Sequence, residues 1–429
     1  MEYPNGLWLS DALQKELKEK FYYADADPQY GERLFFENSG GSLRLKKCVE
    51  AKAELECFPD CPERIHARSL YLRGLVEQGT REILQTVFGA KGGALITELT
   101  ASQAMFHMVG LIMENIPGTN AVVSSIEHPS AFDAVEYYCK KTGKELRAMP
   151  ANRETGGIDA AEVAKYVDRD TCLLSVMSAS NISGNIMDME EIVRTARGIK
   201  PELFIVSDAV QHAPHHALDV EALGIDGMNF APYKFFGIRG CGFAYVSDRV
   251  AALPHCKLIA KEQSVFELGT SAPANFAAAL QIIEYVCALG RRFVKSENKR
   301  ELYKEGMRRI HLQERALLHR MLEGTPQCPG LRHIGGVRVF VDTEDLTRRD
   351  LITAIGIDGM DFTECVAEYQ RRGVTVYERI NTSIYSKRIL DALGLEGAIR
   401  VSPLHCHGKE DVDKFLRITA EIAKYANER

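Results

Sequence analysis

The chain has 429 residues, of which 45% are hydrophobic and 26% are charged, as is typical of a folded protein with two or three domains. Its net charge of -6 and its lack of long Lys/Arg runs exclude a broad basic surface, so we expect no nucleic-acid partner. No apolar run approaches the roughly eighteen residues that cross a bilayer, and the amino terminus lacks a signal-peptide core, so we expect a cytoplasmic protein without a membrane partner.

The amino-terminal part carries few chemical signals. Residues 1–30 favour a helix and a connecting arm, and the first strand pattern is Arg33–Phe36. The turn Glu37–Ser42 that follows could begin a helix with its last serine as the cap. The 11 cysteines are scattered over the whole chain, which argues against a disulfide framework. Cys57 and Cys61 form a close pair without a second pair or a histidine cluster nearby, so we expect no metal site.

A candidate anion site lies near residue 100. The helix pattern Glu77–Phe88 is stopped by glycines, and the strand pattern Ala94–Thr97 follows it. The segment Glu98–Ser102 then opens the helix pattern Gln103–Met113. Free backbone N–H groups and the helix dipole at such an amino terminus favour a phosphate. The alternative is that one of the hydroxyl side chains here only caps the helix.

Strand and helix patterns alternate over residues 90–250. Strand patterns at Ala121–Ser124 and Thr171–Met177 are each followed by a polar segment, and a helix pattern covers Met189–Ile199. This alternation predicts a mostly parallel sheet with helices on both faces. In such sheets ligands bind at the carboxyl ends of the strands, where the polar segments lie.

The stretch from Phe204 to Val246 carries the strongest chemical pattern. Asp208 and Gln211 stand just past the strand pattern Phe204–Val206. Lys234 lies between the apolar run Gly227–Phe230 and a glycine-rich segment, so we expect it to be buried. A buried lysine is easily deprotonated and becomes a nucleophile toward carbonyl groups. The glycines precede the next strand rather than follow one, which excludes a dinucleotide fingerprint.

This arrangement of an Asp-x-x-Gln element and a lysine 26 residues after the aspartate resembles the cofactor site of the class V aminotransferase and cysteine desulfurase family. The resemblance implies pyridoxal phosphate and the α/β fold of fold type I. In that fold a large domain, with a mostly parallel sheet and helices on both faces, is joined to a smaller α+β C-terminal domain. Lys234 would form the Schiff base with the cofactor, and Asp208 would hold the pyridine nitrogen protonated. Gln211 would hydrogen-bond the ring hydroxyl.

The resemblance also implies roles for residues at the other strand ends. Ala101 and Ser102 would bind the cofactor phosphate. His128 would stack on the cofactor ring and move protons during the reaction. Asn181 would contact the cofactor hydroxyl and the substrate carboxylate, and Tyr233 is a further cofactor contact where the family often has histidine. A serine of the family three positions before the lysine is replaced by alanine, which leaves the phosphate with fewer side-chain contacts.

The segment Phe266–Thr270 resembles a family element that reaches the neighbouring subunit's cofactor. Thr270 would make this contact, so the resemblance implies a homodimer with active sites at the subunit interface. Helix patterns at Ala277–Leu289 and Glu301–Leu322 follow, and the remainder alternates helices with strand patterns at Val337–Val341, Val374–Tyr377 and Ala398–Ser402. We expect an arm (1–30), a large cofactor domain (31–290) and a small domain (291–429). Whether the arm packs on the small domain stays open.

The expected substrate is a small amino acid. By resemblance, Arg400 would clamp its carboxylate with two parallel hydrogen bonds, a geometry that lysine cannot copy. Arg379 and Arg388 are alternatives for this role. Family members also have a strand and turn like Arg33–Ser42, where backbone amides face the substrate, so Gly40 and Gly41 are candidate contacts.

One departure from the family pattern bears on the reaction. Cysteine desulfurases carry a nucleophilic cysteine on the loop before the arginine, and the corresponding segment Tyr377–Leu393 contains none. Cys406 lies beyond Arg400 and is either reactive or a buried structural thiol. We therefore expect a lyase that eliminates a sulfur leaving group from the β-carbon of an amino acid, without a protein persulfide. The alternatives are an aminotransferase, an epimerase or a non-catalytic scaffold.

Overall fold

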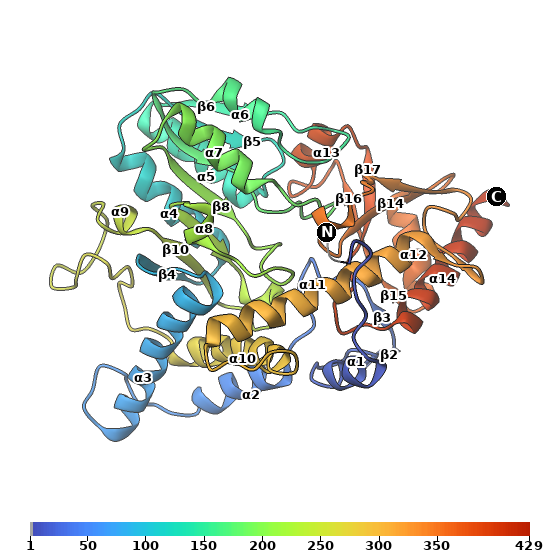
Figure 1. The fold of residues 1–429 in the computed structure, drawn as a ribbon, viewed down its shortest axis with the longest axis horizontal. Coiled ribbons are helices and arrows are strands. Elements are labelled where there is room, and N and C mark those ends of the chain that lie inside the picture. The colour runs from blue at the N-terminus through green and yellow to red at the C-terminus, as the bar shows by residue number, and fades with distance from the viewer. Residues whose placement is uncertain (1–2) are drawn as a thin grey trace.

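The structure, a computed structural model, describes residues 3–429 and is built around a seven-stranded sheet of order β4-β10-β9-β8-β7-β5-β6 (Figure 1). Strand β10 is antiparallel to both of its neighbours, β4 and β9, and the other pairs are parallel. The strands of this sheet are β4 Ala94–Glu98, β5 Asn120–Ser124, β6 Glu145–Met149, β7 Thr171–Ser175, β8 Phe204–Asp208, β9 Gly227–Phe230 and β10 Gly242–Val246. The predicted mostly parallel sheet is therefore confirmed.

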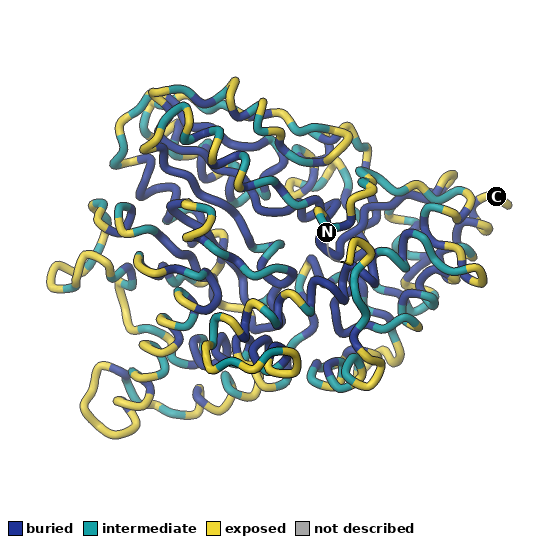
Figure 2. Tube along the Cα trace, in the orientation of Figure 1, coloured by how far each residue is buried: buried dark blue, intermediate teal, exposed yellow. Residues whose placement is uncertain are grey.

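Both faces of the sheet are covered by helices, so its central strands are buried throughout (Figure 2). Successive side chains of a strand point to opposite faces. Val122 belongs to the core cluster that includes α7 (Met189–Ile199) and α10 (Pro273–Gly290). Its neighbours Ala121 and Val123 belong to the cluster formed with α4 (Ala101–Asn115) and α5 (Pro129–Thr142). This double burial explains why the strands read as apolar runs rather than as alternating patterns.

A second sheet of four antiparallel strands, of order β13-β14-β17-β16, forms the C-terminal part. Its strands are β13 Val337–Phe340, β14 Thr353–Ile357, β16 Tyr377–Ile380 and β17 Gly397–Val401. The long helix α11 (Lys299–Glu323) runs from the large sheet to this second sheet (Figure 1). Strand β3 (Leu34–Phe35) pairs with β15 (Val374–Thr375), so the amino-terminal segment contacts the C-terminal part.

The remaining elements are short or lie on the outside. The other α-helices are α1 Asp11–Lys18, α2 Lys46–Leu55, α3 Ala67–Glu82, α6 Ala160–Tyr166, α8 Val220–Leu223, α9 Asp248–Ala251, α12 Phe362–Arg371, α13 Lys387–Leu393 and α14 Lys409–Asn427. Short strands are β1 Ala26–Asp27, β2 Gly31–Glu32, β11 Gly324–Thr325 and β12 Cys328–Pro329, and single turns are Ile83–Val87, Pro232–Lys234 and Leu346–Arg348. No helix over residues 3–429 is long and apolar enough to cross a bilayer.

Most predicted elements end within a few residues of the observed ones, and four larger or more informative differences stand out. The helix predicted at Glu77–Phe88 is the end of α3 followed by a π-helical turn. The strand that begins at Phe204 continues to Asp208, so the aspartate is the last residue of the strand and does not follow it. The segment Val374–Tyr377 belongs to two strands, because β15 pairs with β3 and β16 pairs with β17. Strand β6 was not predicted from the sequence.

Candidate active site

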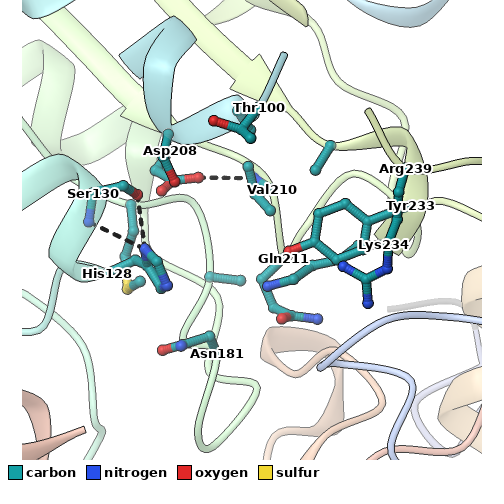
Figure 3. A pocket seen from close by; sticks show the side chains of 15 residues that line it. Thr100, His128, Ser130, Asn181, Asp208, Val210, Gln211, Tyr233, Lys234 and Arg239 are labelled. Carbon is teal, nitrogen blue, oxygen red and sulfur yellow. Dashed lines mark hydrogen bonds between the residues drawn. The ribbon is translucent and has the colours of Figure 1, made fainter. Parts of the chain in front are cut away.

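Most of the residues predicted to bind the cofactor line a cavity of about 210 Å³ at the carboxyl ends of the parallel strands (Figure 3). All predicted cofactor contacts except Thr270 line it: Ala101, Ser102, His128, Asn181, Asp208, Gln211, Tyr233 and Lys234. Thr270 lies on an exposed connection before α10 and does not reach this cavity. The three predicted substrate contacts, Gly40, Gly41 and Arg400, do not line the cavity itself.

Lys234 ends a tight turn that follows β9. Pro232 begins this turn, where a missing N–H costs nothing. The carbonyl of Tyr233 accepts a hydrogen bond from the Ser42 amide (3.1 Å). The lysine side chain is only 8% exposed. Burial, together with the nearby Arg400 guanidinium, lowers the pKa of Lys234 to about 8, which brings a reactive amine within reach of neutral pH.

Asp208 ends β8 with its carboxylate turned into the cavity (Figure 3). Its Oδ1 accepts a hydrogen bond from the Val210 amide (3.0 Å). Burial raises the pKa of this carboxyl group above its usual range, an effect that a cationic partner would reverse. Gln211 stands one turn further on, and its Nε2 donates to the Ser39 hydroxyl (3.4 Å). A carboxylate and an amide thus approach the cavity from the same strand end.

His128 is the residue before α5 and caps that helix, since its Nδ1 accepts from the Ser130 amide (3.2 Å). Burial and the charge of Lys234 lower the pKa of His128 to about 3, so the ring is neutral at physiological pH. The preceding residue, Glu127, is buried and accepts a hydrogen bond from the Met177 amide (2.7 Å). Burial raises the pKa of Glu127 to about 7. The fixed cap places a neutral imidazole at the cavity wall.

The predicted anion site is the amino terminus of α4. Thr100 caps the helix, because its Oγ1 accepts a hydrogen bond from the Gln103 amide (3.1 Å). The role of helix cap, considered for a hydroxyl side chain of this segment, therefore belongs to this threonine. Ala101 and Ser102 occupy the first turn, where amide groups have no partner within the helix. Gly242 of β10 lies against this turn, and a Cβ there would collide with the Ala101 backbone. The close approach explains why glycine stands at the start of β10.

The predicted substrate arginine lies beyond Asn181. Arg400 is 2% exposed, and its Nη1 donates to the Asn181 carbonyl oxygen (2.9 Å). Its Nη2 forms an ion pair with Glu37 (2.5 Å), a partner that the sequence did not indicate. A Cβ at Gly40 would collide with the Glu37 carboxylate, so a larger residue there would push the Glu37 side chain from its present position. Gly41 lies instead near Tyr233 and Arg239.

The two alternative arginines differ in what they contact. Arg388 donates to the carbonyl oxygens of Ser125 (3.0 Å) and Glu127 (3.1 Å), so it holds the loop before α5. Arg379 donates to the Tyr385 carbonyl oxygen (2.9 Å), while its buried Nε has no hydrogen-bond partner. Burial and the charge of Arg400 lower the pKa of Arg379 to about 10. Of the two, Arg379 is the one beside Arg400.

Sequence reasoning missed three residues around the cavity. Arg239 stacks over the Tyr233 ring at 4.3 Å, Ser130 holds the His128 ring, and Glu37 pairs with the buried arginine. A charged residue inside the glycine-rich segment could have pointed to Arg239. No local pattern signals the pairing of Glu37 with a residue 363 positions later.

Comparison with known proteins identifies the family. The family model described as Aminotransferase class-V matches residues 63–415. The chain belongs to the aminotransferase class-V family. The predicted family is thereby confirmed, and with it pyridoxal phosphate as the cofactor of this class V chain.

Relatives of this class V chain include cysteine desulfurases. It is 28% identical over 221 residues to a probable cysteine desulfurase of Mycoplasma genitalium, over 50% of this chain and 53% of that protein. It is also 28% identical over 187 residues to the cysteine desulfurase IscS of Dictyoglomus turgidum, over 43% of this chain and 46% of the relative. The chain thus spans about half the length of the curated relatives it matches.

Solved structures share the fold of the class V chain. The apo cysteine desulfurase of Thermococcus onnurineus has a TM-score of 0.78 at 21% identity, with 96% of this chain and 98% of that chain covered. The cysteine desulfurase CsdA of Escherichia coli has a TM-score of 0.77 at 17% identity, with 97% and 98% covered. These likenesses confirm the predicted fold type I.

The cavity of the class V chain fits pyridoxal phosphate. The open amino terminus of α4 suits the phosphate, and the Asp208 carboxylate suits a protonated ring nitrogen. Two buried amide oxygens, Asn181 Oδ1 and Gln211 Oε1, have no hydrogen-bond partner among residues 3–429. A buried acceptor left unpaired is costly, so a ligand with hydroxyl or N–H donors is expected there.

The pH dependence of cofactor capture tests the depressed pKa of Lys234. We expect the rate at which the cofactor-free class V protein captures pyridoxal phosphate covalently to rise about tenfold per pH unit below pH 8 and to level off above it. The amine form of Lys234 accumulates as pH rises, and its fraction stops growing once the pKa is passed. Borohydride fixation at each pH followed by mass spectrometry of the peptide measures the rate. A rise that continues beyond pH 10 would mean that the lysine has an ordinary pKa.

Proposed function

We propose that this chain is a pyridoxal-phosphate-dependent lyase that removes a sulfur group from the β-carbon of a cysteine-type amino acid, without a persulfide on a protein cysteine. The observation that carries the proposal is the make-up of the cavity. Lys234 and Asp208 face it, yet among residues 3–429 no cysteine lines it. The relatives named cysteine desulfurases favour a sulfur-containing amino acid as the substrate.

The positions of the cysteines support elimination rather than sulfur transfer. The segment that runs through β16 and α13 carries none. Cys406 is buried, and burial raises the pKa of its thiol well above its usual range, which suppresses the reactive thiolate. The exposed thiols, Cys57 and Cys256, do not line the cavity. A leaving thiolate that departs unaided needs no protein nucleophile.

The proposed role of each residue follows from its position in or beside the cavity. The cofactor, when bound, supplies an electron-withdrawing ring that makes the α-proton of the amino acid acidic. Lys234 Nζ, with its depressed pKa, takes this proton, and Asp208 keeps the cofactor nitrogen charged. Arg400 would hold the substrate carboxylate, and His128 would lie beside the cofactor ring. Net, an S-substituted cysteine and water give pyruvate, ammonia and a thiol.

Product analysis tests the proposal. The purified holoenzyme is incubated with cysteine, cystine and S-methylcysteine, and pyruvate and thiol are measured with and without an added keto acid. We expect pyruvate and the sulfur product in equal amounts: sulfide from cysteine, thiocysteine from cystine and methanethiol from S-methylcysteine. The amounts should be independent of the keto acid and unchanged by prior alkylation of exposed thiols. Alanine together with a protein-bound persulfide would indicate a desulfurase, keto-acid-dependent amino transfer an aminotransferase, and inversion at the α-carbon an epimerase. No reaction with any amino acid would favour a scaffold.

Removal of Arg400 should affect the substrate and spare the cofactor. We expect Arg400→Ala to keep the absorption spectrum of the resting enzyme and to lower kcat/KM about a hundredfold, because a charge-assisted contact of about 2 to 3 kcal/mol is lost. Arg379→Ala and Arg388→Ala serve as matched variants. If Arg400→Ala is like wild type and Arg379→Ala shows the loss, then the carboxylate is bound by the neighbouring arginine.

The proposed assembly is a homodimer in which Thr270 reaches the partner's cofactor. Three apolar side chains on the exposed connection before α10 support it, because Leu258 (51%), Ile259 (98%) and Leu268 (52%) are exposed in the single chain. Light scattering of the holoenzyme should give twice the chain mass of 47.9 kDa. A mass of one chain at micromolar concentration would contradict the assembly.

A further inference from the structure

A cluster of histidines lies behind the cavity, on the connection between β8 and α8. Residues 209–216 form a helical turn, since the Ala213 amide donates to the Ala209 carbonyl (2.8 Å) and the His216 amide donates to that of His212 (3.1 Å). Side chains four residues apart share one face of such a turn. The rings of His212 and His216 accordingly stack with their centroids 4.6 Å apart. Histidines at this spacing are a common pair of metal ligands.

A carboxylate from the C-terminal part completes the group. Asp350 precedes β14 and is fully buried, and its amide donates to the Gly184 carbonyl (2.8 Å). Its Oδ2 lies 2.9 Å from His212 Nδ1, and its Oδ1 lies 3.6 Å from His216 Nε2. One ligand atom of each of the three residues lies within 4.8 Å of the others. Two histidines and one carboxylate thus converge from both parts of the molecule.

Hydrogen bonds within the cluster leave two of these atoms unsatisfied. His216 Nε2 and Asp350 Oδ1 are both buried, and neither has a hydrogen-bond partner in the described part of the chain. Over residues 3–429 the Asp350 carboxylate has ion pairs only with His212 and His216, while the adjacent Arg349 pairs with Asp342. A buried carboxylate is costly unless its charge is paired and both of its oxygens are hydrogen-bonded. A bound cation would satisfy both unpaired atoms at once.

We propose that His212, His216 and Asp350 bind a divalent transition-metal ion such as Zn²⁺. Imidazole nitrogen and carboxylate oxygen are ligands that Zn²⁺ accepts readily, and three protein ligands leave a position for water. Zn²⁺ binds nitrogen and oxygen at about 2.0 to 2.2 Å, so ligand atoms around a tetrahedral ion stand roughly 3.4 Å apart. On binding, the 2.9 Å between His212 Nδ1 and Asp350 Oδ2 would lengthen slightly, and any wider separation among the three ligand atoms, which now lie within 4.8 Å, would shorten.

The surroundings provide an approach route and an outer layer. His212 also lines a cavity of about 370 Å³ between α7 and α8, whose wall carries the carboxylates of Asp188, Glu190 and Asp219. Asp188 pairs with Arg348 on the same wall and Asp219 pairs with Arg300, whereas Glu190 forms no ion pair among residues 3–429. An unpaired carboxylate along an approach attracts a cation. On the opposite side the ring of His311 packs against that of His216, with centroids 3.7 Å apart. This contact fixes the ring orientation, as outer groups of metal sites usually do.

The role assigned to the ion is to position residues rather than to react. His212 directly follows Gln211, and Asp350 is bonded to the loop that carries Asn181. A metal here would therefore tie two cavity-lining segments to the C-terminal part of the chain. An ion that binds only the folded protein also stabilises it by mass action. This inference does not depend on which reaction the cavity performs.

Zinc titration of the chelator-treated holoenzyme tests the proposal. Equilibrium dialysis with elemental analysis should find one Zn²⁺ per chain, and the melting temperature should rise on addition of Zn²⁺. His216→Ala and Asp350→Asn should each weaken binding by at least about tenfold and abolish the rise. His66→Ala, an exposed histidine at the start of α3, is the matched control and should bind as wild type does.

Several outcomes would overturn the metal site. Absence of bound Zn²⁺ in the wild type, or binding that both cluster variants leave unchanged, contradicts it. Loss of binding in Cys57→Ser would assign the ion to the surface thiols instead. Should Asp350→Asn fail to fold, His216→Ala decides alone, because its ring is 28% exposed and its truncation leaves the buried carboxylate in place.

Discussion

Replacing Lys234 by alanine should abolish turnover and leave pyridoxal phosphate held only non-covalently. The lysine amine is the single group in the proposed scheme that both attaches the cofactor and moves the substrate proton. We therefore expect kcat to fall by at least about four orders of magnitude, to the background of the cofactor in solution. Borohydride treatment followed by mass spectrometry should find no modified peptide, and dialysis should remove the cofactor.

Two further variants separate the chemistry of Lys234 from its charge. Lys234→Arg keeps a cation in the cavity but supplies no amine nucleophile, so it should be as inactive as the alanine variant. Lys91→Ala changes an exposed lysine next to the large sheet and should retain full activity. Substantial turnover by Lys234→Ala would show that another group performs both tasks, and the assignment of the cavity would be wrong.

Replacing Asp208 by asparagine should slow the chemical step by about two to three orders of magnitude with little change in stability. Asparagine keeps an oxygen that accepts the Val210 amide, so the turn after β8 is preserved. It removes the negative charge that would hold the cofactor nitrogen protonated. A preorganised charge of this kind accelerates the chemical step by about two to three orders of magnitude. Single-turnover kinetics and thermal unfolding measure the two effects separately.

The companion variants decide what Asp208 does. Asp208→Ala removes both the charge and the hydrogen bond to Val210, whereas Asp170→Asn changes an exposed carboxylate and should behave as wild type. If Asp208→Asn is fully active and only Asp208→Ala is impaired, then the residue is a turn cap without an electrostatic role.

The sequence predicted the central strands well because burial on both faces leaves an apolar run with sharp ends. It failed for β6, whose side chains are mostly exposed or half-buried, so that Glu145–Met149 has no apolar run. It also merged β15 with β16, since local patterns do not tell which sheet a strand joins. The domain boundary near residue 290 stays a prediction, because α10 and α11 pack against one another across it.

The cavity was predictable where its residues follow strand ends and not where distant segments meet. Asp208, His128 and Lys234 stand at strand ends that a parallel sheet brings together, and the resemblance to the class V family singled them out. The partner of Arg400 comes from a turn 363 residues earlier, and the carboxylate beside His212 comes from another part of the chain. Such pairings depend on tertiary packing, which neither periodicity nor motif spacing records.

Glu37 already forms an ion pair with Nη2 of Arg400. A substrate carboxylate that binds to Arg400 would therefore displace the Glu37 carboxylate from this nitrogen. The incoming ligand gains an ion pair only as Glu37 gives one up, so the net affinity for any carboxylate is kept low. An amine without a carboxylate cannot make the exchange and leaves Glu37 in place. A small inorganic anion would have to compete with Glu37 in the same way.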